Sequence, residues 1–361
     1  MRAAVLHEGE FTVTDVELPA LRSDQIRVRP LANGICGSDL SAITHTEDFL
    51  AANRAAGTLS FDFDPARPLV MGHEFTSQVL EVGADVSGFQ VDDVIFTLPW
   101  VVDGAGVMRT VGYSNDYPGG LGEEAIVGGS GHVKLPPGTD PLLAATLEPI
   151  ATGVNGVLRT DPRPGDAALV TGAGPVGLGA VVELAARSIS PIVVSDPSSV
   201  RRELALAYGA THVVDPADAD PVDTVQAQAP GARIVVIEAS AAPGLLTGLI
   251  DRCPAHTVFG VVGSNTRPDQ LRTMTAVIKN ATLLFVTGPA RTERRYEALW
   301  RAAEHLQAER FDPALMVTGW TGLAGVPAAV AALRPGHGQI EHVKILVCPE
   351  SDTPGLSSTR P

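Results

Sequence analysis

The sequence predicts an α/β protein in two parts, a β-rich part and a doubly wound parallel sheet. In the first 150 residues, short strand segments such as 25–28, 77–82 and 93–96 lie between clusters of Gly, Pro and Asp. From about residue 166 the pattern changes to short apolar strands that alternate with helical segments. Such alternation is typical of a parallel sheet covered by helices on both faces.

The expected elements set the expected domain boundaries. In the second part we expect strands at 167–171, 192–196, 212–214, 233–238, 257–262 and 282–286, and helices at 178–187, 200–208 and 292–309. A strand at 343–347 returns to β character, so the end of the chain is expected to complete the first part. We therefore place the β-rich part at 1–153 and 290–361 and the parallel sheet at 154–289. Residues 351–361 are small, polar and Pro-rich, which predicts a frayed tail.

Composition limits the class of protein. A chain of 361 residues with 45% hydrophobic residues can build two packed domains. The formal net charge of −15 argues against nucleic-acid and anionic-membrane partners and favours a small-molecule substrate. No apolar run reaches the roughly 18 residues of a membrane span, and Glu8 and Glu10 interrupt the place of a signal peptide. We expect a cytoplasmic protein. The three cysteines are too few for a disulfide framework or a four-cysteine zinc site.

A Gly-rich turn follows the strand expected at 167–171. Its sequence fits G-x-G-x-x-G and gives the candidate cofactor-binding residues Gly172, Gly174, Pro175, Val176 and Gly177. Gly172 permits the turn, Gly174 lets the backbone approach a pyrophosphate, and Gly177 lets the helix pack on the sheet. By itself the pattern also fits an ordinary turn. Here it joins a strand to a helix, so a Rossmann dinucleotide site is predicted.

Asp196 ends the next expected strand, 19 residues after Gly177. This is close to the ~20-residue spacing of the carboxylate that holds the adenosine ribose. A carboxylate there favours NAD over NADP because it repels a 2′-phosphate. The nearby Arg201 and Arg202 could weaken that preference, and a solvated strand-end carboxylate is the simpler interpretation of Asp196 alone.

A second group of residues has the chemistry of a metal site. Cys36, the pair His73-Glu74 and Glu148 offer a thiolate, an imidazole and carboxylates, which suit zinc. The spacing is not that of a zinc finger, and three protein ligands with an open position would make a catalytic site. From these residues alone, a buried cysteine and an ordinary His-Glu pair remain reasonable alternatives.

Taken in order, these motifs resemble the zinc-containing medium-chain dehydrogenase/reductase family, which includes alcohol, sorbitol and threonine dehydrogenases. The markers are G-I-C-G-S-D at 34–39, G-H-E at 72–74, L-E-P at 147–149, G-A-G-P-V-G at 172–177 and H-V-K-I-L at 342–346. The resemblance spans almost the whole chain. It implies a β-rich, GroES-like catalytic domain joined to a Rossmann cofactor domain.

The resemblance assigns the metal ligands. Cys36 and His73 would ligate a catalytic zinc, and Glu148 would be the third ligand, at the place where alcohol dehydrogenases carry cysteine and the polyol branch carries glutamate. Glu74 would be an alternate ligand or would stay in the outer shell.

The resemblance also assigns substrate and cofactor contacts. Ser38 would hydrogen-bond the substrate hydroxyl, and Asp39 would orient the zinc histidine. Thr152 would line the nicotinamide pocket, Arg201 would touch the adenosine ribose, and Lys344 would touch the pyrophosphate.

Three departures from the family pattern matter. The stretch 96–127 contains no cysteine, so the four-cysteine lobe is missing and one zinc per subunit is expected. Ser41 stands where the family often has a relay histidine; His45 could replace it, although a surface histidine fits as well. The segment between Ser41 and Met71 is longer than expected and contains three phenylalanines, so we expect it to reshape the substrate entrance.

The implied activity is that of an NAD-dependent zinc alcohol dehydrogenase. Zinc would act as a Lewis acid on the substrate oxygen, hydride would pass to the nicotinamide, and the proton would leave through Ser38. Glutamate as third ligand favours a secondary alcohol or a polyol. Two alternatives are a zinc-free quinone or enone reductase, whose branch lacks Cys36, His73 and Glu148, and a non-catalytic dinucleotide-binding protein.

The strand expected at 282–286 lies at the edge of the parallel sheet. Exposed apolar edges tend to pair, and related enzymes join subunits through such strands. A homodimer or homotetramer is therefore expected.

Overall fold

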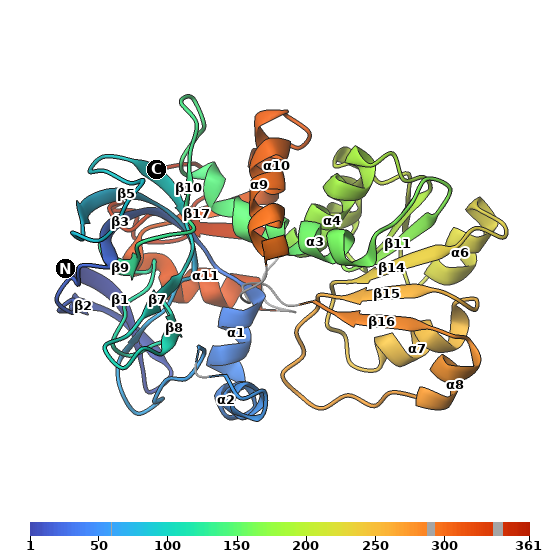
Figure 1. The fold of residues 1–361 in the computed structure, drawn as a ribbon, viewed down its shortest axis with the longest axis horizontal. Helices are drawn as coiled ribbons and strands as arrows, with labels where there is room; N and C mark the ends of the chain where they lie inside the picture. The colour runs from blue at the N-terminus through green and yellow to red at the C-terminus, as the bar shows by residue number, and fades with distance from the viewer. Residues whose placement is uncertain (59, 287–292, 335–341) are drawn as a thin grey trace. The chain divides into compact units, whose positions relative to one another are not determined.

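The computed structural model describes residues 1–58, 60–286, 293–334 and 342–361, without the side chains of 293–295. The chain divides into two compact units (Figure 1). Unit 1 comprises Met1–Thr146 and Val317–Pro361, and unit 2 comprises Leu147–Met316. The second unit is thus inserted into the sequence of the first.

Unit 2 is built on a six-stranded parallel sheet with the order β13-β12-β11-β14-β15-β16. Counted from β11, this is the 3-2-1-4-5-6 order of the Rossmann fold, so the predicted doubly wound sheet is confirmed. Its strands are β11 (Ala167–Thr171), β12 (Ile192–Ser195), β13 (His212–Val214), β14 (Ile234–Glu238), β15 (Val258–Val261) and β16 (Thr282–Phe285). Its helices are α3 (Leu147–Thr160), α4 (Pro175–Ala186), α5 (Ser199–Ala207), α6 (Pro221–Gln228), α7 (Leu245–Arg252), α8 (Thr273–Ile278), α9 (Glu293–Gln307) and α10 (Pro313–Met316).

Apolar side chains on both faces of this sheet are covered. On one face Leu169, Val193 and Val236 form a core with residues of α6 and α7. On the other face α4 packs on the sheet and contacts α3 and α5 (Figure 1). Because both faces are buried, the strands are continuous apolar runs rather than alternating ones.

Unit 1 is β-rich. Its largest sheet has the order β10-β6-β5-β3-β18-β17, with β9 also paired to β3. The strands are β1 (Arg2–His7), β2 (Glu10–Asp15), β3 (Gln25–Gly34), β4 (Leu69–Val70), β5 (Glu74–Val82), β6 (Val94–Thr97), β7 (Trp100–Val102), β8 (Met108–Thr110), β9 (Ala125–Gly128), β10 (Val133–Lys134), β17 (Val317–Thr321) and β18 (Lys344–Val347). The helices are α1 (Gly37–Thr44), α2 (Thr46–Ala55) and α11 (Val326–Leu333), with 3-10 turns η1 (Leu143–Thr146) and η2 (Leu323–Gly325).

The boundaries between the units differ from those expected at 153/154 and 289/290. Helix α3 belongs to unit 2 because Gly153 packs directly on α4, where a Cβ would overlap the carbonyl of Val176. Helix α9 belongs there because Arg301 pairs with the buried Glu183 of α4. The expected break at 290 and the start of the helix expected at 292 lie outside the described residues.

The prediction of a frayed tail is wrong. The backbones of Ser357 and Trp320 exchange two hydrogen bonds of 2.8 Å. Arg360 forms an ion pair with Asp140, and its guanidinium lies 5.9 Å from the centre of the Trp320 ring. Composition alone could not reveal these long-range partners.

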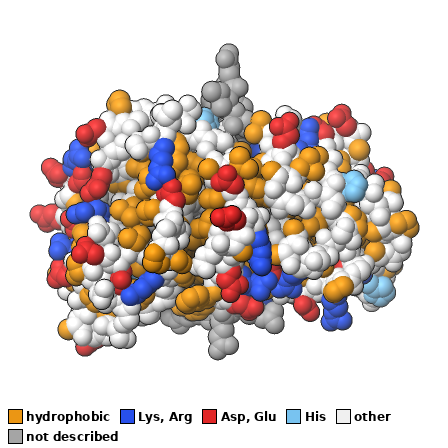
Figure 2. Space-filling view, turned by 90° about the horizontal axis from the view of Figure 1, so that it is seen from above, with side chains coloured by type: hydrophobic (Ala, Val, Ile, Leu, Met, Phe, Trp, Pro, Cys, Tyr) orange, Lys and Arg blue, Asp and Glu red, His pale blue; other side chains and the backbone are white. Residues whose placement is uncertain are grey.

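The surface carries charges of both signs. On the face drawn in Figure 2, acidic and basic side chains of the described residues are interspersed, and no continuous basic field is visible there. Among the described helices, none is long and apolar enough to cross a bilayer.

Candidate metal and dinucleotide sites

Strand register in unit 1 brings the first group of motif residues together. Gly34, the last residue of β3, pairs with Glu74, the first residue of β5. On the other side of β3, Gly34 pairs with Leu346 of β18. Three motifs that are far apart in the sequence therefore meet at one end of this sheet, which places Cys36, His73, Glu74 and Lys344 in one region.

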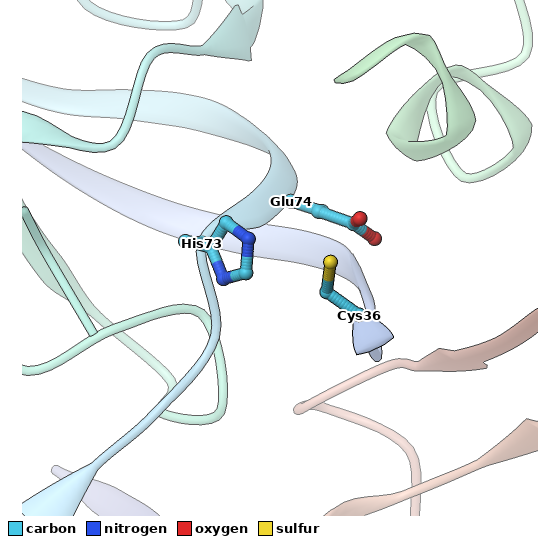
Figure 3. Close-up of side chains that lie close together, drawn as sticks. All are labelled: Cys36, His73 and Glu74. Carbon is cyan, nitrogen blue, oxygen red and sulfur yellow. The ribbon is translucent and has the colours of Figure 1, made fainter. Parts of the chain in front are cut away.

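Cys36, His73 and Glu74 form a cluster that we call the donor cluster. One possible ligand atom from each residue lies within 4.8 Å of the others. Figure 3 shows the sulfur, the imidazole and the carboxylate directed toward one common space. A thiolate, an imidazole and a carboxylate form a donor set that fits zinc, and among the described residues this is the group that satisfies those distance limits.

Asp39 contacts two members of the donor cluster, His73 and Cys36. Its Oδ1 lies 3.2 Å from Nδ1 of His73, without the alignment of a hydrogen bond. Its Oδ2 accepts the N–H of Cys36 at 3.0 Å, because Asp39 occupies the third position of α1 and Cys36 precedes the helix. With Nδ1 facing Asp39, Nε2 is left to face a cation, which is the usual arrangement of a ligating histidine and its carboxylate.

The electrostatics of the donor cluster favour a positive charge. Burial, followed by the charge of Glu74, raises the pKa of the Cys36 thiol. Burial acts to lower the pKa of His73, but Asp39 and Cys36 together raise that pKa well above its usual value. Burial likewise opposes ionisation of Asp39, yet His73 and the hydrogen bonds from Cys36 and Tyr113 hold the pKa of Asp39 below its usual range.

Lys344 is part of the same region. Its ammonium is 2% exposed, forms an ion pair with Glu74 and donates to the carbonyl of Ile35 at 3.0 Å. The ion pair neutralises Glu74. The contact of Lys344 with a pyrophosphate, which the family resemblance implied, stays a prediction.

Ser38 has a partner that the sequence did not indicate. Its Oγ lies 2.9 Å from the hydroxyl of Tyr113, which in turn donates to Oδ1 of Asp39 at 2.7 Å. Tyr113 lies in the stretch where the cysteine lobe is missing, and nothing in its spacing points to Ser38, 75 positions away.

The long segment after Ser41 packs over Tyr113. Phe49 of α2 stacks on its ring at 5.5 Å, and Phe61 lies at 5.1 Å. His45 is exposed between α1 and α2. The side chain of Ser38 hydrogen-bonds Tyr113. The relay role of His45 stays a prediction.

The Gly-rich turn of unit 2 has the conformation that a pyrophosphate site requires. Gly172 has φ +88°, and a Cβ on Gly177 would overlap the Gly172 carbonyl, so the helix start lies directly on the turn. Gly174 precedes α4, with Pro175 and Val176 in its first turn and no side-chain cap on the helix end. A Cβ at Gly174 would meet only Nη1 of Arg201, at 3.8 Å. The open backbone N–H groups and the nearby cation suit an anionic group.

Asp196 follows β12 and supports the same turn. Its carboxylate accepts the N–H of Ala173 at 2.7 Å and the N–H of Ser198 at 2.9 Å. Each carboxylate oxygen keeps capacity for further hydrogen bonds. Arg202 is directed elsewhere: it donates to the Asp196 carbonyl at 2.7 Å and to Asp215 at 2.9 Å.

The remaining predicted residues lie on α3 in unit 2. Glu148 is in its first turn, and Thr152 follows one turn later, half-buried, with its hydroxyl 3.3 Å from the Glu148 carbonyl. The roles of Glu148 and Thr152 stay predictions.

Comparisons with known proteins identify relatives of both units. Residues 22–137 match the alcohol dehydrogenase GroES-like domain, and residues 175–304 match the zinc-binding dehydrogenase family. L-threonine 3-dehydrogenase of Pyrococcus horikoshii is 31% identical over 68% of this chain and 70% of its own length. Sorbitol dehydrogenase of Bacillus subtilis is 30% identical over 63% of this chain and 64% of its own length. The crystal structure of 2R,3R-butanediol dehydrogenase from Bacillus subtilis matches with a TM-score of 0.77 and 25% identity, over 97% of this chain and 99% of that one.

Proposed function

This chain belongs to the zinc-containing medium-chain dehydrogenase/reductase family, and we propose that it oxidises a secondary alcohol or polyol with NAD. The observation that carries the proposal is the donor cluster: Cys36, His73 and Glu74 place sulfur, nitrogen and oxygen within 4.8 Å of one another. A zinc-free reductase of the same fold would not need this set of zinc ligands. A non-catalytic dinucleotide-binding protein would not need it either.

Each residue has a defined task in this proposal. Cys36 and His73 hold zinc, and Asp39 orients the imidazole. When bound, zinc would supply the Lewis acidity that lowers the pKa of the substrate alcohol, and NAD would take up the hydride while the alcohol proton leaves through Ser38. Ser38 accepts the hydrogen bond of the substrate hydroxyl. The turn at Gly172 and Gly174 cradles the pyrophosphate.

Two observations support the proposed substrate class. Glutamate at position 148 is the residue that the resemblance links to the polyol branch, and relatives of this chain include enzymes named for threonine, sorbitol and butanediol. All are small polar alcohols. The acidic charge balance favours such a substrate over a nucleic acid, and the cytoplasm stays the expected compartment.

A substrate panel tests the proposal. Purified protein is incubated with NAD and, in turn, secondary alcohols, vicinal diols, polyols and hydroxy amino acids, while NADH absorbance is followed. We expect turnover with at least one member, lost on zinc chelation and restored by zinc. Zinc-independent reduction of a quinone or an enone, without any alcohol oxidation, would favour the reductase alternative.

The preference for NAD has its own test. Asp196→Ala removes the ribose acceptor and the charge that repels a 2′-phosphate. We expect KM for NAD to rise and the ratio of NAD to NADP efficiency to fall by about tenfold or more. Asp215→Ala, which removes the carboxylate paired with Arg202, is the matched control. Equal efficiency of the wild type with both cofactors would contradict the assignment.

The third zinc ligand is proposed to be Glu148, with Glu74 as an alternate that acts during ligand exchange. The ion pair with Lys344 supports this order, because it already engages Glu74. Glu148→Ala should then lower zinc content and turnover together, whereas Glu74→Ala should spare zinc content and slow exchange at the metal. Loss of metal in Glu74→Ala and full zinc in Glu148→Ala would reverse the assignment.

We also propose a homodimer or homotetramer built on the edge strand β16. Phe285 of β16 is 65% exposed, and Val277 of the neighbouring α8 is 70% exposed, so an apolar edge is available for pairing. Phe285→Glu should shift the sedimentation coefficient toward the monomer, and Val91→Glu, which introduces the same charge at an exposed apolar residue of unit 1, should not. A monomeric wild type at micromolar concentration would contradict the proposal.

A further inference from the structure

The hydroxyl of Tyr113 connects two residues of the catalytic unit. It lies 2.9 Å from Ser38 Oγ and 2.7 Å from Asp39 Oδ1, and the tyrosine side chain is completely buried. The side chain comes from the loop after β8, far in sequence from both partners. Neither the family motifs nor the donor cluster includes it.

A count of protons fixes the direction of these hydrogen bonds. An ionised carboxylate can only accept, so Tyr113 donates its single proton to Asp39. The tyrosine oxygen can then only accept from Ser38. The hydroxyl proton of Ser38 is therefore directed at Tyr113, and what Ser38 presents to any other partner is a lone pair.

This direction selects between two kinds of ligand. A substrate hydroxyl carries a proton that it can donate to Ser38. A carbonyl oxygen or a sulfoxide oxygen has no proton to donate, so it would face a lone pair and gain nothing. The hydrogen-bond chain thus orients Ser38 for an alcohol.

Neighbouring aromatic rings prevent Tyr113 from turning away. Phe49 stacks on its ring at 5.5 Å, Phe61 lies at 5.1 Å, and the His73 imidazole lies at 5.1 Å on another side. Phe49 and Phe61 both come from the long segment after Ser41. That segment therefore holds the hydroxyl of Tyr113 against Asp39.

We propose that Tyr113 is a positioning residue: it fixes Ser38 as the acceptor of the substrate hydroxyl, and Phe49 and Phe61 hold it in place. The inference rests on the proposed function, because it assumes that Ser38 meets an alcohol. It adds a specificity device that the family resemblance did not supply.

A double-mutant cycle on turnover tests the inference. Tyr113→Phe removes only the hydroxyl and should lower kcat for alcohol oxidation by about 10- to 100-fold, the worth of a hydrogen bond to a charged group. KM for NAD and zinc content should not change. Ser38→Ala should cost at least as much, and the double variant no more than Ser38→Ala, because Tyr113 acts through Ser38. Tyr117→Phe, another buried tyrosine of the same loop, is the matched control.

A binding measurement keeps the test independent of turnover. Trifluoroethanol donates a hydroxyl proton and dimethyl sulfoxide only accepts, so the complex of wild-type holoenzyme with cofactor should prefer the former. Tyr113→Phe should reduce that preference by about tenfold. If Tyr113→Phe does not fold, Phe61→Leu, which loosens the ring, must give the same change in preference.

The two failures are distinguishable. Absence of turnover with every alcohol, with the ligand preference intact, overturns the proposed function and leaves the orientation of Ser38 supported. Independent, multiplicative losses in the two single variants, or an unchanged ligand preference in Tyr113→Phe, overturn the role of Tyr113.

Discussion

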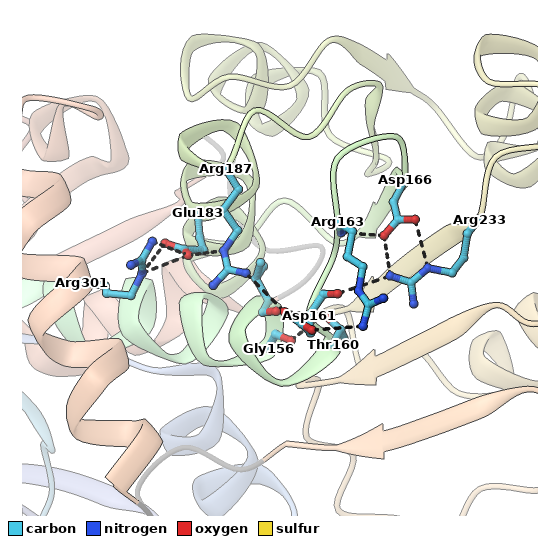
Figure 4. A network of polar contacts seen from close by, with 10 residues as sticks. Gly156, Thr160, Asp161, Arg163, Asp166, Glu183, Arg187, Arg233 and Arg301 are labelled. Atoms are coloured by element: carbon cyan, nitrogen blue, oxygen red, sulfur yellow. Dashed lines mark hydrogen bonds and ion pairs between the residues drawn. The ribbon is translucent and has the colours of Figure 1, made fainter.

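Two buried clusters of this molecule contain similar side chains and differ in what those side chains contact. The donor cluster of unit 1 holds Cys36, His73 and Glu74. In unit 2, Glu183 of α4 meets Arg187, Arg301 and His305, which we call the α4–α9 network. Figure 4 shows Glu183 with Arg187 and Arg301. Each cluster has a buried glutamate and a buried histidine.

In the α4–α9 network every charge has a partner. Oε1 of Glu183 accepts from Arg187 at 2.6 Å and from Arg301 at 3.0 Å, and Oε2 lies 2.6 Å from Nε2 of His305. Arg310 donates to Nδ1 of His305 at 2.8 Å, so Nδ1 accepts and Nε2 donates to Glu183. Both carboxylate oxygens of Glu183 and both ring nitrogens of His305 therefore already have partners among the described residues.

In the donor cluster the same groups are not satisfied by one another. Nδ1 of His73 faces Asp39, which leaves Nε2 for a ligand, and the Cys36 thiol faces a carboxylate that raises its pKa. A buried polar group without a partner is costly unless a ligand completes it. The difference teaches that residue type does not distinguish a site from a structural network. The distribution of hydrogen bonds does.

The largest expected effect is the loss of a metal ligand. Cys36→Ser should remove most of the bound zinc and lower turnover by more than about 100-fold, because a hydroxyl replaces the thiolate ligand. Elemental analysis of the wild type should give about one zinc per chain. Cys253→Ser, at a cysteine buried in the core of unit 2, should keep zinc and turnover. Two zinc ions per wild-type chain, or none in active protein, would contradict the assignment.

The α4–α9 network should behave in the opposite way. Glu183→Gln removes the buried carboxylate that pairs with Arg187 and Arg301, and it should cost about 3 kcal/mol of unfolding free energy, without loss of zinc. Hydrogen exchange of α9 peptides should accelerate. Glu304→Gln, at an exposed glutamate of α9, is the matched control. Loss of zinc in Glu183→Gln would break the comparison.

Low pH should reduce the stability that the α4–α9 network contributes. Although burial opposes it, the hydrogen bonds from His305, Arg301 and Arg187 lower the pKa of Glu183 from 4.5 to about 2. A lowered carboxyl pKa means that the stabilisation is complete above pH 4.5 and is lost as the pH falls toward 2. The wild type should therefore lose stability between these values, and Glu183→Gln should lose less.

Sequence and structure can be compared residue by residue at this point. That Cys36, His73 and Glu74 lie together was predictable from the family resemblance, and strand register brings them together. The cofactor role of the Gly-rich turn and of Asp196 stays a prediction, although the conformation of the turn was predictable from its glycine spacing. Tyr113 was not, since a single aromatic residue in a loop carries no periodic signal. His305 was not either, because its partner Glu183 lies 122 positions earlier in an apolar helix.

A third buried imidazole sharpens the comparison. Nδ1 of His132 accepts the N–H of Leu98 at 3.0 Å, and Nε2 lies 2.6 Å from the Gly128 carbonyl. It has backbone partners but no counter-charge among the described residues, so burial lowers its pKa from 6.5 to about 4. The neutral form stabilises the fold fully above pH 6.5, and this stabilisation is lost progressively as the pH falls to 4.

The expected size of this effect is about 2 kcal/mol between pH 7.5 and pH 5. His132→Gln should be less stable at neutral pH and should depend less on pH over this range, as measured by the urea midpoint. His7→Gln, at an exposed histidine of the same unit, should retain the wild-type dependence. An unchanged pH dependence in His132→Gln would show that the imidazole is not held neutral by the fold.

The smallest effect is expected where an ion pair is exposed. Arg360 contacts Asp140 with both guanidinium nitrogens, one of them at 3.0 Å, but its side chain is 46% exposed. Exposed pairs contribute little because water and salt screen them, so Arg360→Ala should cost no more than about 1 kcal/mol and the cost should shrink further at high salt. Deletion of residues 351–361 should cost more, because it also removes the backbone hydrogen bonds between Ser357 and Trp320. If Arg360→Ala destabilised the protein as much as Glu183→Gln, the presence of an ion pair rather than its burial would determine the loss of unfolding free energy. The contrast between the two buried clusters would then need another cause.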